Sequence, residues 1–207
     1  MKNKKGSVKK FSISSKLSTL EVGSSLDKLL KPATRFLARK GITPNGLTFI
    51  GAGLTLGVPL AMVKGLWIWA GIWLLFAGFF DVLDGALARN EELKSRFGAF
   101  LDSTLDRVSE ALVLAGFLVY YQQQGRLDGC LLAFFVFLLS VLVSYTRARA
   151  EGLGLECRVG LLPRPGRVAL LALGFFIKQP TWALGLVGLL SLVTVFQRIH
   201  WVWVKTK

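Results

Sequence analysis

Four aspartates are the residues of this sequence best suited to chemistry. They lie within residues 79–107, at the edges of strongly apolar segments: Asp81, Asp84, Asp102 and Asp106. A carboxylate at the centre of a membrane costs about 2.5–3.5 kcal/mol on insertion scales. The first two are three residues apart and the last two are four residues apart, so each pair shares one face of a helix. Four such carboxylates repel one another unless a positive partner holds them together.

The polar segment 90–97 lies between the two pairs and predicts a tight reversal of the chain. The two helices are then expected to be antiparallel neighbours, with all four carboxylates facing one another just below the membrane surface. Only Arg89 and Arg107 are near enough to neutralise them, which is too few for a structural ion-pair network. Clustered carboxylate oxygens suit hard divalent cations such as Mg²⁺. The pattern therefore indicates a divalent-metal site, and a pair of such ions can bridge phosphate oxygens and stabilise the attacking and leaving groups of a displacement.

The elements that carry these residues are membrane-spanning helices. The 207-residue chain is 53% hydrophobic and has a mean hydropathy of +0.53, which excludes a disordered chain, a collagen-like fibre or a disulfide scaffold. A bilayer core of about 30 Å needs about 20 apolar residues per helix. Apolar runs predict six spans, of which the fifth is short: residues 46–64, 66–88, 97–121, 127–146, 165–178 and 181–204. We therefore expect an all-α integral membrane protein with six transmembrane helices.

Positive charge predicts the orientation of these spans. Of the 26 Lys and Arg residues, 22 lie in the segments 1–45, 89–96, 147–167 and 198–207. By the positive-inside rule, these segments, both termini and the aspartates face the cytoplasm. The net charge of +14 does not indicate nucleic-acid binding, because the basic residues sort by membrane side. A transporter or ion-binding membrane protein is the alternative of a different class, but carboxylates near one membrane surface do not outline a path across it.

The N-terminal segment 1–45 is expected to form a basic cytoplasmic arm, and residues 46–207 a catalytic transmembrane domain. Residues 26–40 intersperse leucines with lysines and arginines. Such a segment favours an interfacial helix lying on an anionic leaflet. A plain basic tail that only sets the topology is the alternative.

The aspartates belong to a longer motif of eight defined positions in 26 residues: Asp81, Asp84, Gly85, Ala88, Arg89, Gly98, Asp102 and Asp106. This motif resembles the signature of the CDP-alcohol phosphotransferases. The resemblance implies a transferase of phospholipid biosynthesis, in which an acceptor hydroxyl attacks the lipid-side phosphorus of a CDP-linked lipid and releases CMP. It implies that Asp81, Asp84 and Asp102 bind two Mg²⁺ ions, or Mn²⁺ in their place. Asp106 would complete the metal site and act as general base.

The same resemblance implies a binding site for the CDP-linked lipid. Gly85, Ala88 and Arg89 would meet the nucleotide and its pyrophosphate, and Ser95 would add a polar contact. A second family element precedes the first span and would lie against the cytidine: Pro44, Asn45, Gly46 and Leu47. The residues themselves leave another interpretation open, in which Asn45 is simply the N-cap of the first span.

Three arginines at the ends of the fourth and fifth spans bear on the acceptor: Arg147, Arg164 and Arg167. Arginines there are usually topogenic, but a converging cluster can hold a phosphate. The sequence resembles the family branch that uses inositol phosphate, which implies that these arginines bind the acceptor phosphate. The usual acidic partners are replaced by Pro163 and Gly166, so glycerol 3-phosphate or another alcohol stays open as acceptor. The resemblance also implies a homodimer in the plasma (inner) membrane; an ester or ether lipid donor is left undecided.

Overall fold

The computed structural model describes residues 12–207, with side chains described from residue 26 onward. Within this part of the chain there are eight helices and no strand, which confirms the all-helical class. The helices are α1 (Ser12–Arg39), α2 (Pro44–Leu54), α3 (Gly57–Val63), α4 (Trp67–Asn90), α5 (Arg96–Gln123), α6 (Leu127–Gly152), α7 (Arg164–Phe176) and α8 (Pro180–Thr206).

Four segments of the described chain are long and apolar enough to cross a membrane: Pro44–Val63, Trp67–Asn90, Leu127–Gly152 and Pro180–Thr206. The protein is therefore membrane-embedded. α5 is long enough, but its first half carries the charged residues of the predicted site. α7 has only 13 residues, fewer than the roughly 20 that a span perpendicular to the bilayer needs.

The first predicted span is divided into α2 and α3. The break follows Thr55, a buried residue whose hydroxyl donates to the carbonyl of Gly51. At the other end of α2, Pro44 occupies the first turn and Thr43 is the N-cap, with the amide of Gly46 donating to the Thr43 hydroxyl at 3.2 Å. The expectation that Asn45 caps this helix was wrong, because a cap needs extended backbone and the helix already begins at Pro44.

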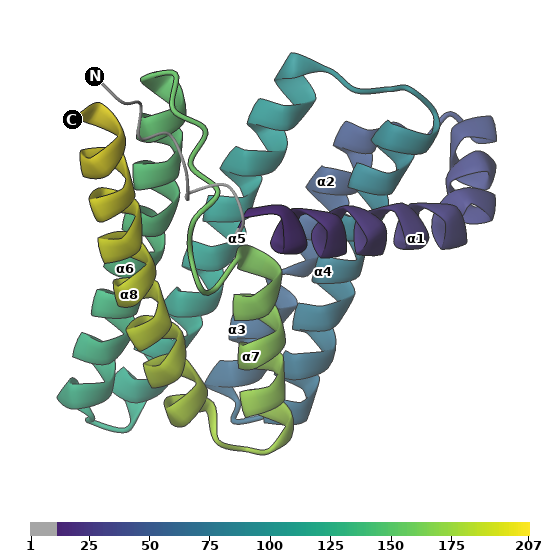
Figure 1. Cartoon of the computed structure of the whole chain (residues 1–207). Coiled ribbons are helices and arrows are strands. Elements are labelled where there is room, and N and C mark those ends of the chain that lie inside the picture. The colour runs from purple at the N-terminus through teal and green to yellow at the C-terminus, as the bar shows by residue number, and fades with distance from the viewer. Residues whose placement is uncertain (1–11) are drawn as a thin grey trace, which may run out of the picture.

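The helices form a bundle, and their packing brings together aspartates that are distant in sequence (Figure 1). α2 packs against both α4 and α5, and so does α3; α6 packs against α5 and α8, and α7 against α4 and α8. α4 and α5 are thus held mainly through α2 and α3, rather than by the extensive direct packing expected of antiparallel neighbours. The main core includes Phe117, Tyr121 and Phe175, whose rings pack together.

Helix α1 lies across the bundle rather than along it (Figure 1). One of its faces docks on α4 and the start of α2, where Leu30 and Leu37 pack against a small core of Leu47, Leu83 and Leu87. Pro32 lies inside α1, which continues on both sides of it. The docked helix covers the same end of α4 that carries the predicted nucleotide-binding residues.

Candidate functional site

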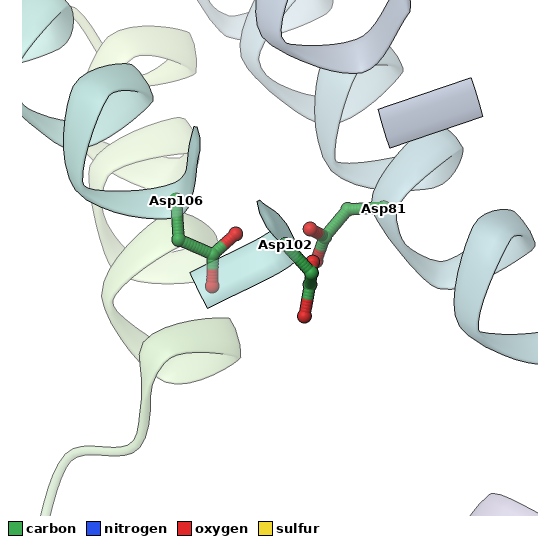
Figure 2. A group of neighbouring side chains, drawn as sticks. All are labelled: Asp81, Asp102 and Asp106. Atoms are coloured by element: carbon green, nitrogen blue, oxygen red, sulfur yellow. The ribbon is translucent and has the colours of Figure 1, made fainter. Parts of the chain in front are cut away.

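Three of the four aspartates point toward one another across the space between α4 and α5 (Figure 2). One carboxylate oxygen from each of Asp81, Asp102 and Asp106 lies within 4.8 Å of the others. Asp102 and Asp106 are one turn apart on α5, so the same face of that helix presents both to Asp81 of α4. The spacing argument thus found the cluster, and the described residues contain no other group of this kind.

Asp84 is not part of that group, so the expectation that all four carboxylates face one another was wrong. It lies one turn beyond Asp81 on α4, is only 5% exposed, and lines the same cavity as Asp81 and Asp106. Its Oδ2 atom is buried and has no hydrogen-bond partner. A buried carboxylate oxygen with no donor is costly, and a cation is the partner that would satisfy it.

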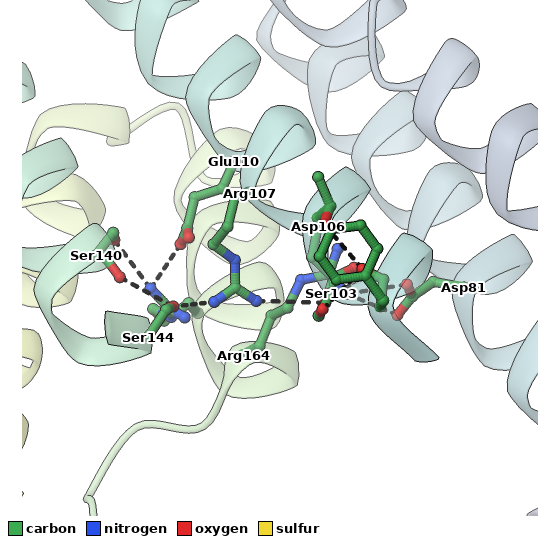
Figure 3. Close-up of polar contacts among 11 residues, drawn as sticks. Asp81, Ser103, Asp106, Arg107, Glu110, Ser140, Ser144 and Arg164 are labelled. Atoms are coloured by element: carbon green, nitrogen blue, oxygen red, sulfur yellow. Dashed lines mark hydrogen bonds and ion pairs between the residues drawn. The ribbon is translucent and has the colours of Figure 1, made fainter. Parts of the chain in front are cut away.

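Arg164, in the first turn of α7, joins the aspartate cluster (Figure 3). Its Nη1 atom donates to both carboxylate oxygens of Asp81 at 2.9 Å and lies 2.5 Å from Oδ1 of Asp106. One guanidinium therefore bridges carboxylates from α4 and α5. It places a partly buried positive charge directly beside the acidic group, which the order of residues along the chain does not reveal.

A second polar layer lies behind this cluster (Figure 3), and the sequence analysis named its arginines but missed Glu110, Ser140 and Ser144. Arg107 donates to the hydroxyl of Ser144 and lies 3.4 Å from Asp106. Arg167 is 4% exposed and lies 2.6 Å from the carboxylate of Glu110. Glu110 follows Asp106 by four residues, so the stripe that identified Asp102 and Asp106 extends to it; this is the signal that could have found it.

One cavity between α2, α4, α5, α6 and α7 is lined by three of the four aspartates, which are Asp81, Asp84 and Asp106, and by Glu110, Ser140, Arg164 and Arg167. Its walls combine the carboxylates of Asp81 and Asp84 with Arg164 and Arg167, while Leu74 belongs to its apolar lining. Arg147 is elsewhere: it is exposed and pairs with Glu151 at 2.8 Å, one turn along α6. The structure therefore brings Arg164 and Arg167 to the acidic site and leaves Arg147 paired within its own helix.

The predicted nucleotide-binding residues fall into two neighbouring groups. At the start of α5, Ser95 is the N-cap and its hydroxyl accepts from the amide of Gly98 at 2.9 Å. A side chain at Gly98 would meet both that hydroxyl and the Oδ1 atom of Asn45, at about 3 Å, so the first turn of α2 lies against the start of α5. Pro44 and Gly46 form the first turn of α2 with Asn45, and Leu47 is buried in the small core below it.

The second group lies at the end of α4, where Gly85, Ala88 and Arg89 follow Asp84. The Arg89 guanidinium lies back along the helix over Gly85, and its other contact is Asp27 of α1. Because Arg89 donates hydrogen bonds to the Asp27 carboxylate, the pKa of Asp27 lies below its ordinary value. The sequence motif does not predict this contact with α1, because the motif does not include residue 27.

Comparison with known proteins agrees with this geometry. Residues 41–203 match the family model described as CDP-alcohol phosphatidyltransferase. The chain belongs to this family, and it is a membrane-embedded transferase that uses CDP-alcohol substrates.

Two relatives within this family are similar to the chain over most of its length. The chain is 36% identical over 188 residues to a phosphatidylinositol phosphate synthase of Streptomyces avermitilis, covering 83% of this chain and 77% of the relative. It is 37% identical over 177 residues to an archaetidylinositol phosphate synthase of Pyrococcus horikoshii, covering 84% of this chain and 92% of the relative.

Solved structures of one relative are also similar. The crystal structure of Mycobacterium tuberculosis phosphatidylinositol phosphate synthase with CDP-DAG bound matches with a TM-score of 0.79 and 30% identity, covering 85% of this chain and 94% of that one. The same enzyme in complex with manganese and citrate matches with a TM-score of 0.76, covering 84% of this chain and 88% of that one.

Proposed function

We propose that this protein transfers the phosphatidyl group of CDP-diacylglycerol, or an ether analogue, to a hydroxyl of inositol phosphate and releases CMP. The assignment of a phosphorylated acceptor rests on the position of Arg164, whose guanidinium bridges Asp81 and Asp106. A cation in this position lies where a phosphorylated acceptor would be brought beside the carboxylates. The similarity to phosphatidylinositol and archaetidylinositol phosphate synthases supports the same acceptor.

The proposed metal ligands are Asp81, Asp84, Asp102 and Asp106, holding two divalent ions, preferably Mg²⁺. The all-oxygen donor set and the buried, unpartnered Oδ2 of Asp84 fit such ions. When bound, the ions would neutralise negative charge on the pyrophosphate and on the transferred phosphoryl group. A structure of the M. tuberculosis relative in complex with manganese and citrate supports the binding of a divalent metal.

Asp106 is the proposed general base. The acceptor hydroxyl oxygen forms a bond to the lipid-side phosphorus, the bond from that phosphorus to the CMP oxygen breaks, and the hydroxyl proton passes to Asp106. Asp106 suits this role because it lies next to Arg164 and lines the cavity. The base and the cation that would hold the acceptor are thus in contact before substrate arrives.

The donor site is proposed to combine the start of α2 with the C-terminal end of α4 and the N-terminal end of α5. It comprises Pro44, Asn45, Gly46, Leu47, Gly85, Ala88, Arg89 and Ser95. The approach of Asn45 to Gly98 supports this grouping, because it joins two motif segments that are separated in sequence. For the acceptor, Arg164 and Arg167 line the cavity, and Arg147 would need to leave Glu151 to join them.

For the membrane arrangement we propose six spans, formed by α2 with α3 and by each of α4 to α8, with both termini and the site in the cytoplasm. Residues 46–207 are the catalytic domain, and residues 1–45 are a cytoplasmic arm in which α1 lies at the interface. The docked α1 supports this, because its exposed Leu26, Leu29 and Phe36 lie on a face separate from its basic residues. A homodimer in the plasma membrane completes the proposal.

Release of CMP by purified protein tests the reaction. With CDP-diacylglycerol and Mg²⁺, inositol 1-phosphate should give release that chelation abolishes, whereas glycerol 3-phosphate should not. Asp106→Asn should fold and bind metal but show no turnover, while Asp128→Asn, in an exposed ion pair with Arg126, serves as the matched control. Release of CMP with glycerol 3-phosphate alone would overturn the assignment of inositol phosphate as acceptor. Full activity of Asp106→Asn would overturn the assignment of Asp106 as general base.

Cysteine labelling tests the topology. In a background without Cys130 and Cys157, Glu92→Cys should react only from the cytoplasmic side of oriented vesicles and Lys178→Cys only from the other side. The reverse pattern would overturn the orientation.

A further inference from the structure

The contact between α1 and α4 centres on a two-point ion pair. Nε of Arg89 donates to Oδ2 of Asp27, and Nη2 of Arg89 donates to Oδ1, each at 2.8 Å. Parallel hydrogen bonds of this kind fix the plane of a guanidinium as well as its position. The two residues are 62 positions apart, so only the docking of α1 brings them together.

This pairing leaves one edge of the guanidinium available. A guanidinium has five N–H donors, and the pair with Asp27 uses one on Nε and one on Nη2. Of the three remaining donors, one on Nη1 and one on Nη2 form the other edge. Nη1 lies over Gly85, only 2.9 Å from where a Cβ would stand. The Arg89 side chain is 45% exposed, so this free edge is open to a ligand above Gly85.

Further contacts hold Asp27 itself in place. The side-chain amide of Asn90 donates to the backbone carbonyl of Asp27 at 2.9 Å and to the hydroxyl of Thr34 at 3.3 Å. Thr34 is fully buried between α1 and α4. The apolar contacts of Leu30 and Leu37 lie on the same face of α1. The carboxylate of Asp27 is thus fixed relative to α4, as a group that orients another side chain must be.

We propose that Asp27 is a positioning residue of the donor site: it holds the Arg89 guanidinium over Gly85 so that the free Nη1–Nη2 edge receives a phosphate oxygen of the CDP-linked lipid. This inference rests on the proposed function, in which Arg89 meets the pyrophosphate. It makes α1 a part of the donor site and not only a membrane contact. Without Asp27, the arginine side chain samples many rotamers, and binding must order it first.

Removal of Asp27 could also have the opposite effect on donor binding, so an experiment can distinguish the two cases. A carboxylate could compete with phosphate for Arg89, and its removal would then strengthen donor binding. The positioning role requires the reverse. The two Asp27 hydrogen bonds use the Nε edge, whereas the phosphate would use the other edge, so the ligands do not compete for the same donors.

The experiment measures CDP-lipid binding without an acceptor, together with KM and kcat in the complete assay, for purified protein with Mg²⁺ present throughout. Asp27→Asn should weaken donor binding about ten-fold, equivalent to about 1.4 kcal/mol, and raise the donor KM, while the acceptor KM and kcat change little. Asp27→Glu should restore part of the loss. Asp128→Asn, which removes the exposed pair with Arg126, should leave donor binding unchanged. Thr34→Val removes one of the contacts that hold Asp27 but keeps the Asp27 carboxylate, so it should weaken donor binding less than Asp27→Asn does.

A double-mutant cycle distinguishes positioning from general stability. In an Arg89→Ala background, Asp27→Asn should have no further effect on donor binding, because the side chain it acts through is gone. Unchanged or tighter donor binding by Asp27→Asn would overturn the proposal while leaving the transferase function intact. An equal loss in Thr34→Val would also overturn it, since α1 docking alone would then be responsible. Failure of the unaltered protein to bind the CDP-linked lipid would instead overturn the proposed function.

Discussion

The buried ion pair between Arg167 and Glu110 allows a stability prediction with a defined magnitude. Arg167 is 4% exposed, its Nη1 atom lies 2.6 Å from Glu110 and 2.9 Å from the Ser140 hydroxyl, and its Nε atom is buried without a partner. Glu110→Ala would leave this guanidinium with one neutral hydrogen bond. Removing one member of a buried pair costs about 3–5 kcal/mol. Because Ser140 remains, we expect about 3 kcal/mol, the lower end of that range.

Reversible unfolding in detergent by increasing denaturant measures this difference. A loss of about 3 kcal/mol lowers the folding equilibrium constant about 150-fold. Glu156→Ala is the matched control, because its pair with Arg158 is largely exposed, and such pairs contribute about 0–1 kcal/mol. The double variant Glu110→Leu with Arg167→Met should recover most of the stability, since neither charge then remains buried. A change no larger for Glu110→Ala than for Glu156→Ala would refute the reasoning.

Three further predictions concern the acceptor, helix packing and pH. Arg164→Ala should raise the KM for a phosphorylated acceptor in steady-state assays while sparing CDP-lipid binding; equal weakening of both would contradict the acceptor assignment. Gly174→Ala should destabilise the fold by about 1–3 kcal/mol, measured by thermal unfolding, because its Cβ would lie 2.2 Å from that of Ala183, whereas Gly185→Ala, with open space around it, should not. Because hydrogen bonding to Arg89 lowers the pKa of Asp27 below 3.8, the contribution of this pair to α1 docking is present above that pH and lost as the pH falls through the lowered value. Hydrogen-exchange rates in α1, compared between the native protein and Asp27→Asn at the same pH, should therefore become equal as the pH is lowered. A difference that stays constant with pH would contradict the prediction.

The sequence predicted the site most reliably where the chemistry follows helical periodicity. The spacing of Asp102 and Asp106 put both on one face of α5, and this face does meet Asp81 in the structure. Hydropathy predicted most helix boundaries to within a few residues, because membrane insertion depends on apolar content over about 20 residues. It could not place the break between α2 and α3, since one apolar run continues through both.

The roles of single polar residues near helix ends were less predictable. Asn45 was expected as an N-cap, but Thr43 has that role. Both residue types cap helices well, and the local sequence does not distinguish them. Asp84 shares a helix face with Asp81 by its spacing, yet the packing of α2 and α5 against α4 admits only one of the two to the three-aspartate group.

The sequence by itself determined the all-helical class, the apolar segments and the family motif, because each depends on residue type and on spacing within one helix. The tertiary structure alone decided the contacts between helices: Arg164 with Asp81, Arg167 with Glu110, and Arg89 with Asp27. Each pair joins residues far apart in sequence. Which cation meets which carboxylate depends on how the helices pack and rotate against one another, and no local pattern encodes that geometry.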